Sequence, residues 1–168
     1  MSLYYGIPIL MVAAVIQSAW LDGVSFFGGR PDLVLLLTVT WSIIRGAEEG
    51  ALWGFVGGIF CDLLSGTGPG LWTLSLTTVG LLAGRPWVQA LGPTLIRLAL
   101  MSAFGTVASH IVLLLTMTLL GYEVEMTQAL ITVAGPAAFQ NLLLSPFAFT
   151  FLVWFHQRSR YAPGGFAA

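Results

Sequence analysis

The sequence predicts an all-α, polytopic membrane protein with six transmembrane helices. Hydrophobic residues make up 57% of the chain and charged residues only 8%, against about 25% charged residues in a typical soluble domain. In addition, Leu98–Leu120 and Ala129–Phe155 contain no formally charged side chain. At about 1.5 Å of rise per residue, a helix over either stretch exceeds the roughly 30 Å of hydrocarbon in a bilayer.

The helices are expected where apolar stretches are bounded by glycine, proline or charge. In chain order, the six predicted helices are Leu3–Leu21, Leu33–Ile44, Ala51–Leu64, Leu71–Ala83, Leu98–Leu120 and Ala129–Phe155. The first lacks the positively charged start of a signal peptide, so we expect an uncleaved span. The second, third and fourth are short for a bilayer. Each must borrow flanking residues, thin the bilayer or be partly re-entrant, and the second and third could together form a re-entrant hairpin.

The arginines predict the orientation of these helices. Six spans place five arginines on the side of the two termini and only Arg30 on the other side. The five are Arg45, Arg85, Arg97, Arg158 and Arg160. Because basic residues beside spans remain in the cytoplasm, both termini are predicted to be cytoplasmic. Residues 1–160 are therefore expected to form one six-helix domain, followed by a flexible cytoplasmic tail over residues 161–168.

Composition also limits the function. The chain has no lysine, no basic run and a formal net charge of −1, which argues against nucleic acid or a polybasic lipid-binding patch. Cys61 is the single cysteine, so it is expected to be a packing residue rather than a disulfide or metal ligand. No paired metal-binding histidines, phosphate loop or nucleophile elbow occurs. We therefore expect no enzymatic activity, no metal and no cofactor.

A glycine stripe is the strongest packing signal. Gly50, Gly54 and Gly58 recur every four residues, so they share one face of the third predicted helix, which another backbone can approach closely. Asp62 continues this face. The favoured interpretation is that Asp62 accepts hydrogen bonds from the next turn or from the start of the fourth helix. The alternative makes it a ligand or partner contact.

Further polar and turn residues are expected near the outer surface. They are Arg30, Pro31, Asp32, Ser65, Gly66 and Gly70. Asp32 directly precedes the second helix, where a carboxylate satisfies free backbone N–H groups and complements the helix dipole. Its predicted role is a helix cap. Arg30 and Asp62 are expected at similar depth, which leaves an ion pair between them as an alternative.

Three polar residues lie near the middle of the last two predicted helices. His110 is in the fifth, and Gln140 and Asn141 are in the sixth. Because these helices are antiparallel, we expect the three side chains at matching depth and favour a structural hydrogen bond between them. A proton relay is disfavoured, because no acidic residue is expected at the depth of His110. Pro136 and Pro146 should kink the sixth helix and free carbonyls for nearby polar side chains.

The middle of the chain resembles a known family. The resemblance is carried by the residues Pro31-Asp32-Leu33, Gly54-Phe55, Gly58, Asp62-Leu63-Leu64-Ser65-Gly66 and Gly70. These resemble the rod shape-determining protein MreD family, and the length and six hydrophobic segments are similar too. Where that family usually has Pro-Leu-Gly, this chain has Gly68-Pro69-Gly70.

The resemblance implies a non-catalytic scaffold in the inner membrane that positions peptidoglycan synthesis during rod-shaped growth. The implied partners are MreC, RodA with its penicillin-binding transpeptidase partner, MreB, and membrane lipid. The implied fold is similar to the six-helix substrate-binding subunits of energy-coupling-factor transporters. A substrate-binding subunit of a vitamin or small-molecule transporter is therefore the alternative function, and it should enclose a pocket near the outer surface with several convergent polar groups.

Overall fold

Every element in the described part of the chain is a helix, which confirms the all-α prediction. The computed structural model describes residues 2–20, 29–66, 68–122 and 125–160. The predicted tail over residues 161–168 lies outside these ranges. The helices are α1 (Ser2–Trp20), α2 (Leu33–Arg45), α3 (Ala47–Ser65), α4 (Leu71–Ala83), α5 (Pro86–Gln89), α6 (Thr94–Leu119), α7 (Met126–Ala129), the π-helical turn η2 (Leu130–Ala134) and α8 (Gly135–Arg160).

Each predicted helix has a counterpart. α6 begins at Thr94 rather than Leu98, α8 ends at Arg160 rather than Phe155, and the start of α3 also differs. This helix begins at Ala47 rather than Ala51, so its first turn contains Glu48 and Glu49. Carboxylates stabilise that position because they complement the positive end of the helix dipole. Glu49 also forms an ion pair with Arg45 at the end of α2, with an N–O distance of 2.8 Å.

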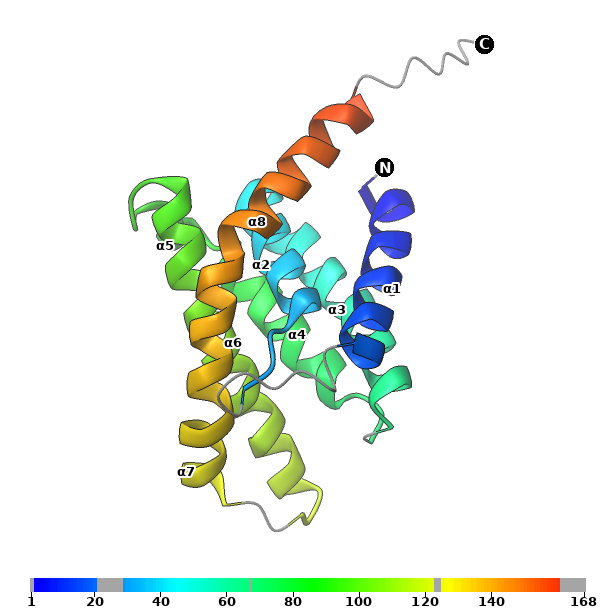
Figure 1. Cartoon of the computed structure of the whole chain (residues 1–168), viewed down its shortest axis with the longest axis vertical. Coiled ribbons are helices and arrows are strands. Elements are labelled where there is room, and N and C mark those ends of the chain that lie inside the picture. The colour runs from blue at the N-terminus through cyan, green and yellow to red at the C-terminus, as the bar shows by residue number, and fades with distance from the viewer. Residues whose placement is uncertain (1, 21–28, 67, 123–124, 161–168) are drawn as a thin grey trace.

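The helices form a bundle, with the start of α1 and the end of α8 at the same end of it (Figure 1). α6 and α8 pack side by side along one flank, α1 lies on the opposite flank against α3, and α2 and α4 lie between them. At the other end of the bundle, α6 and α7 extend beyond α1 (Figure 1). The unequal lengths leave a recess at this end, where several polar residues meet.

α2 is the central helix of the bundle. Its residues from Val34 to Ser42 are all buried, as expected for a helix that is apolar on all sides. The buried hydroxyl groups of Thr38, Thr40 and Ser42 each donate to a carbonyl one turn earlier, at 2.6 to 2.8 Å. Because their donors are satisfied within the helix, these side chains do not disrupt the core.

The predicted glycine stripe packs against α4. A methyl group at Gly54 would overlap the carbonyl of Leu76, and one at Gly58 would overlap the backbone of Thr73. Gly50 lies against Gly80, whose own missing side chain leaves room for the backbone of α3. The close helix contact predicted for Gly50, Gly54 and Gly58 is therefore confirmed, with α4 as the partner.

The last helix is irregular at both prolines. Directly before Pro136, the N–H of Gly135 bonds to the carbonyl of Leu130, which closes the wider turn of a π-helix. Pro146 has no N–H to donate to the carbonyl of Leu142, and the hydroxyl of Ser145 donates to that carbonyl instead, at 2.8 Å. The prediction that a polar side chain satisfies a freed carbonyl is confirmed here.

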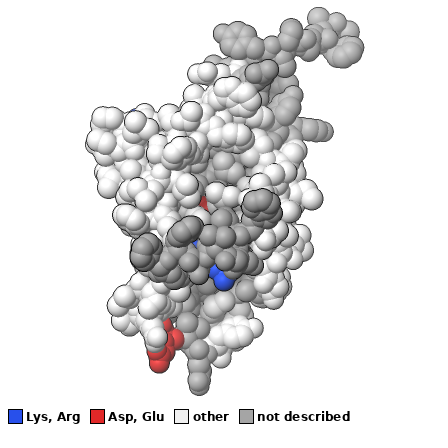
Figure 2. Space-filling view, in the orientation of Figure 1, with Lys and Arg blue, Asp and Glu red and all other residues white. Residues whose placement is uncertain are grey.

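The outer surface of the bundle is largely apolar. Thr94–Leu119 and Met126–Phe155 are long and apolar enough to cross a membrane. Phe147 is 72% exposed and Ile131 70% exposed, and such large exposed apolar side chains are common over the helices. Figure 2 shows few charged atoms on one face of the molecule. A surface of this kind is unfavourable in water.

Candidate functional site

Asp62 holds the start of α4. Its Oδ1 accepts from the N–H of Trp72 at 2.8 Å, and its Oδ2 accepts from the N–H groups of Gly70 and Thr73 at 2.9 and 3.1 Å. The hydroxyl of Thr73 also donates to Oδ2 at 2.6 Å. The prediction that Asp62 accepts bonds from the turn and the start of the fourth helix is confirmed. These oxygens serve α4 rather than an ion pair with Arg30.

Two glycines shape the turn that Asp62 closes. Gly66 follows α3 with a φ of 64°, and Gly70 precedes α4 with a φ of 96°. Both lie in the left-handed region, where a side chain would be strained. Together with Ser65 they reverse the chain within a few residues, which brings the first N–H groups of α4 to Asp62.

Asp32 caps α2 as predicted, and its side chain is buried inside the bundle. Its Oδ1 accepts from the N–H of Leu35 at 2.9 Å, and the residue is only 4% exposed. The Asp32 N–H donates to Oδ1 of Asn141, also at 2.9 Å. Asn141 in turn donates to the Thr106 hydroxyl near the middle of α6, at 2.8 Å. Asp32 therefore lies level with the middle of α6.

The chain enters the bundle before α2 begins. The carbonyl of Gly29 accepts from Nε2 of Gln140 at 3.3 Å. A side chain at Gly29 would overlap the backbone of Pro136 and Ala137 on α8. The segment 29–32 thus lies directly on α8, held by the side chains of Gln140 and Asn141.

The expected hydrogen bond between His110 and Asn141 or Gln140 is wrong. His110 Nδ1 lies 2.8 Å from the carbonyl oxygen of Thr106, one turn earlier on the same helix. Because a carbonyl can only accept, Nδ1 must carry the proton, and a neutral ring then leaves Nε2 as an acceptor. Asn141 approaches the same residue through the Thr106 hydroxyl. His110 and Asn141 therefore meet at Thr106 without bonding to each other.

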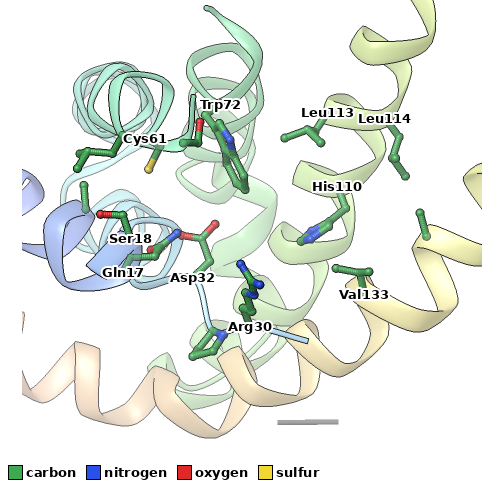
Figure 3. Close-up of a pocket in the computed structure, with 15 residues that line it drawn as sticks. Gln17, Ser18, Arg30, Asp32, Cys61, Trp72, His110, Leu113, Leu114 and Val133 are labelled. Atoms are coloured by element: carbon green, nitrogen blue, oxygen red, sulfur yellow. The ribbon is translucent and has the colours of Figure 1, made fainter. Parts of the chain in front are cut away.

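The expectation that no acidic residue lies near His110 is wrong, because Asp32 lies near it. The two residues line one cavity of about 530 Å³ and interact electrostatically. Figure 3 shows Asp32 and His110 on opposite sides of this space, with the guanidinium of Arg30 between them. We call this space the Asp32 cavity. Its volume is within the range of about 300–1,000 Å³ that small-molecule sites occupy.

The Asp32 cavity has a polar and an apolar side. Polar side chains come from α1 (Gln17), from the segment before α2 (Arg30 and Asp32) and from α6 (His110), and Leu113 and Val133 are apolar. Asp32 Oδ2 and Trp72 Nε1 are both buried without a hydrogen-bond partner among the described residues. Cys61, which is buried as a packing residue, also lies at the wall.

The structure brings only part of the predicted set together. Arg30, Pro31, Asp32, Ser65 and His110 line the cavity, whereas the glycine stripe and Asp62 belong to the α3–α4 contact. Sequence analysis missed Gln17, whose Oε1 accepts from the N–H of Val34 at 3.2 Å. A lone amide within an otherwise apolar helix was the available signal. It also missed Gly80 on α4 and Gly84 directly after α4, whose spacing of four matches that of the stripe.

Comparison with known proteins adds no relative: no family model, no curated protein and no solved structure matches this chain.

Proposed function

We propose that this chain is a multi-pass protein of the bacterial inner membrane, with six helical segments in the bilayer and both termini in the cytoplasm. The apolar outer surface and the two long apolar helices support this proposal. α3 also supports it, because its 19 residues rise about 28 Å, close to the thickness of the hydrocarbon. This length favours a full crossing over a re-entrant hairpin.

The hydrogen bonds of the segment 29–32 also support a position within the membrane. Non-helical backbone is tolerated at membrane depth only where protein or a polar cavity satisfies its hydrogen-bonding groups. Here Gln140 and Asn141 bond to the carbonyl of Gly29 and to the N–H of Asp32. The extended segment and α2 would therefore cross the bilayer together, inside a shell of other helices.

The orientation gives a direct prediction. A reporter fused after Ala168 is expected to report a cytoplasmic position, and one inserted within residues 121–127 a periplasmic position, because five of the six arginines lie on the side of the termini. Alkaline phosphatase and green fluorescent protein fusions measure the two sides independently. A periplasmic C-terminus would overturn the proposed orientation.

Within the membrane, we propose a non-catalytic scaffold of the cell-elongation machinery, similar to the MreD family and associated with MreC. One observation carries this proposal: the residues that resemble the MreD family have structural roles in this chain. Asp32 caps α2, Asp62 caps α4, and the glycines between them join α3 to α4. The matching residues thus build the middle of the bundle, and the chain would act through packing on MreC, RodA, its transpeptidase partner and MreB.

Affinity purification tests this function. The tagged chain, expressed in a rod-shaped host and extracted in a mild detergent, is expected to retain MreC in comparable amount and RodA in smaller amount. Leu52→Ile, on an exposed face of α3, is the matched variant that should leave both unchanged. Purification free of MreC, at normal abundance of both proteins, would contradict the scaffold proposal.

The Asp32 cavity favours a second candidate function, a substrate-binding subunit of a transporter. Its volume and convergent polar groups are typical of small-molecule sites. The same purification separates the two candidates, because a transporter subunit would retain an ATPase-bearing partner in place of MreC.

A further inference from the structure

The Asp32 cavity contains polar groups that the described part of the protein leaves unsatisfied. Asp32 Oδ2 is buried with no hydrogen-bond donor, and Trp72 Nε1 is buried with no acceptor. His110 lines the same space, and its Nδ1 is committed to the carbonyl of Thr106. Burying a carboxylate oxygen without a donor is costly unless another molecule supplies that donor.

The arrangement around Asp32 specifies what that molecule must offer. Oδ1 is already committed to the N–H of Leu35, so the open position is on Oδ2. A carboxylate oxygen with an open position and a negative charge matches a primary ammonium group, which carries three donors and one positive charge. The unpartnered indole N–H of Trp72 matches an oxygen acceptor on the same molecule.

The rest of the wall limits the shape of the ligand. Leu113, Leu114 and Val133 form an apolar side, which suits a hydrocarbon or aromatic body. Arg30 points into the same space (Figure 3) and takes part in a further interaction of its own.

We propose that the Asp32 cavity binds a small molecule or lipid headgroup that carries one primary ammonium group and one acceptor oxygen on an apolar body. Asp32 Oδ2 accepts from the ammonium, and Trp72 Nε1 donates to the oxygen. Free amino alcohols and phosphatidylethanolamine share this chemistry. The inference does not depend on the scaffold function, because it concerns occupancy of the cavity and not a partner protein.

The first arm of the test uses a soluble probe. The full chain, in nanodiscs of phosphatidylglycerol, is titrated calorimetrically with phenylethanolamine and with styrene glycol, in which a hydroxyl replaces the amine. Saturable binding of the amine alone is expected. Asp32→Asn keeps a good helix cap but removes the charge, and it should raise the Kd by about tenfold or more. Trp72→Phe should raise it by about threefold.

The second arm tests the lipid source. Replacing half of the phosphatidylglycerol by phosphatidylethanolamine is expected to raise the thermal midpoint of the wild-type chain more than that of Asp32→Asn. Glu48→Gln is the matched control, because it removes an exposed carboxylate in the first turn of α3. Asp32→Ser, also a good cap, replaces Asp32→Asn if the latter does not fold.

The two arms together decide the proposal and its source. An Asp32-dependent effect of phenylethanolamine alone assigns a free amine, and one of phosphatidylethanolamine alone assigns the headgroup. If neither arm distinguishes wild type from the Asp32 variants, or if styrene glycol binds as tightly as the amine, the proposal is wrong. Retention of MreC by the same variants is measured separately, so a failure here is distinguishable from a failure of the scaffold function.

Discussion

Gly54→Ala is expected to destabilise the protein strongly. The added methyl group would overlap the carbonyl of Leu76 and the peptide that follows it. Since backbone cannot rotate away as a side chain can, α3 and α4 would have to separate along their contact. Overpacking costs about 1–3 kcal/mol and occasionally more, so we expect a loss of about 3 kcal/mol at this contact between two backbones.

A matched glycine substitution isolates this effect. At Gly68 an added methyl group meets only Cδ1 of Leu71, at an ordinary distance of 3.6 Å, so Gly68→Ala should change the free energy of unfolding by less than about 0.5 kcal/mol. Thermal unfolding in detergent and the yield of monodisperse protein measure both variants. Equal stability of Gly54→Ala and the wild type would show that α3 and α4 are not in backbone contact.

Asp62→Leu is the substitution with the second largest expected effect. It removes the acceptor for three backbone N–H groups and for the Thr73 hydroxyl. The loss of a helix cap and the unpaired donors together should cost about 2–4 kcal/mol. The first turn of α4 should fray, and hydrogen exchange at Trp72 and Thr73 should accelerate.

Asp62→Asn is the matched variant with the same shape. Its single oxygen can take the place of Oδ2, which accepts three of the four bonds, while its amide group then faces the N–H of Trp72. We therefore expect a smaller loss, about 1 kcal/mol, and better complementation of rod shape in a host depleted of its own copy. Equal inactivity of both variants at equal abundance would show that the negative charge itself is required, as a partner contact would demand.

Asp62 and the glycine stripe are the features that could be predicted best from the sequence. The repeat of Gly50, Gly54 and Gly58 predicted a close backbone contact, and the distance from Asp62 to Gly70 along the chain is short enough for one turn to join them. Caps, turns and helix faces depend on residues a few positions apart. Local spacing therefore carries enough information to predict them, even though it did not name α4 as the partner of the stripe.

The depth of Asp32 illustrates the opposite case. From the sequence it is a cap at the outer end of a helix, and it is a cap, yet its N–H bonds to Asn141, which lies 109 residues further along the chain. No local pattern indicates that the segment 29–32 enters the bundle and lies on α8. Packing between segments far apart in the sequence also places Asp32 near His110 and Asn141 beside Thr106.

The sequence by itself determined the helical class, the positions of the helices, the glycine contact and the two aspartate caps, because apolar runs, fourfold spacing and capping residues act within one or two turns of chain. Only the tertiary structure decided the partners of the buried polar groups and the existence of the Asp32 cavity. Those features depend on how far α6 and α7 extend beyond the shorter helices and on which side chains meet there. Contacts between residues a hundred positions apart leave no periodic trace in a single sequence.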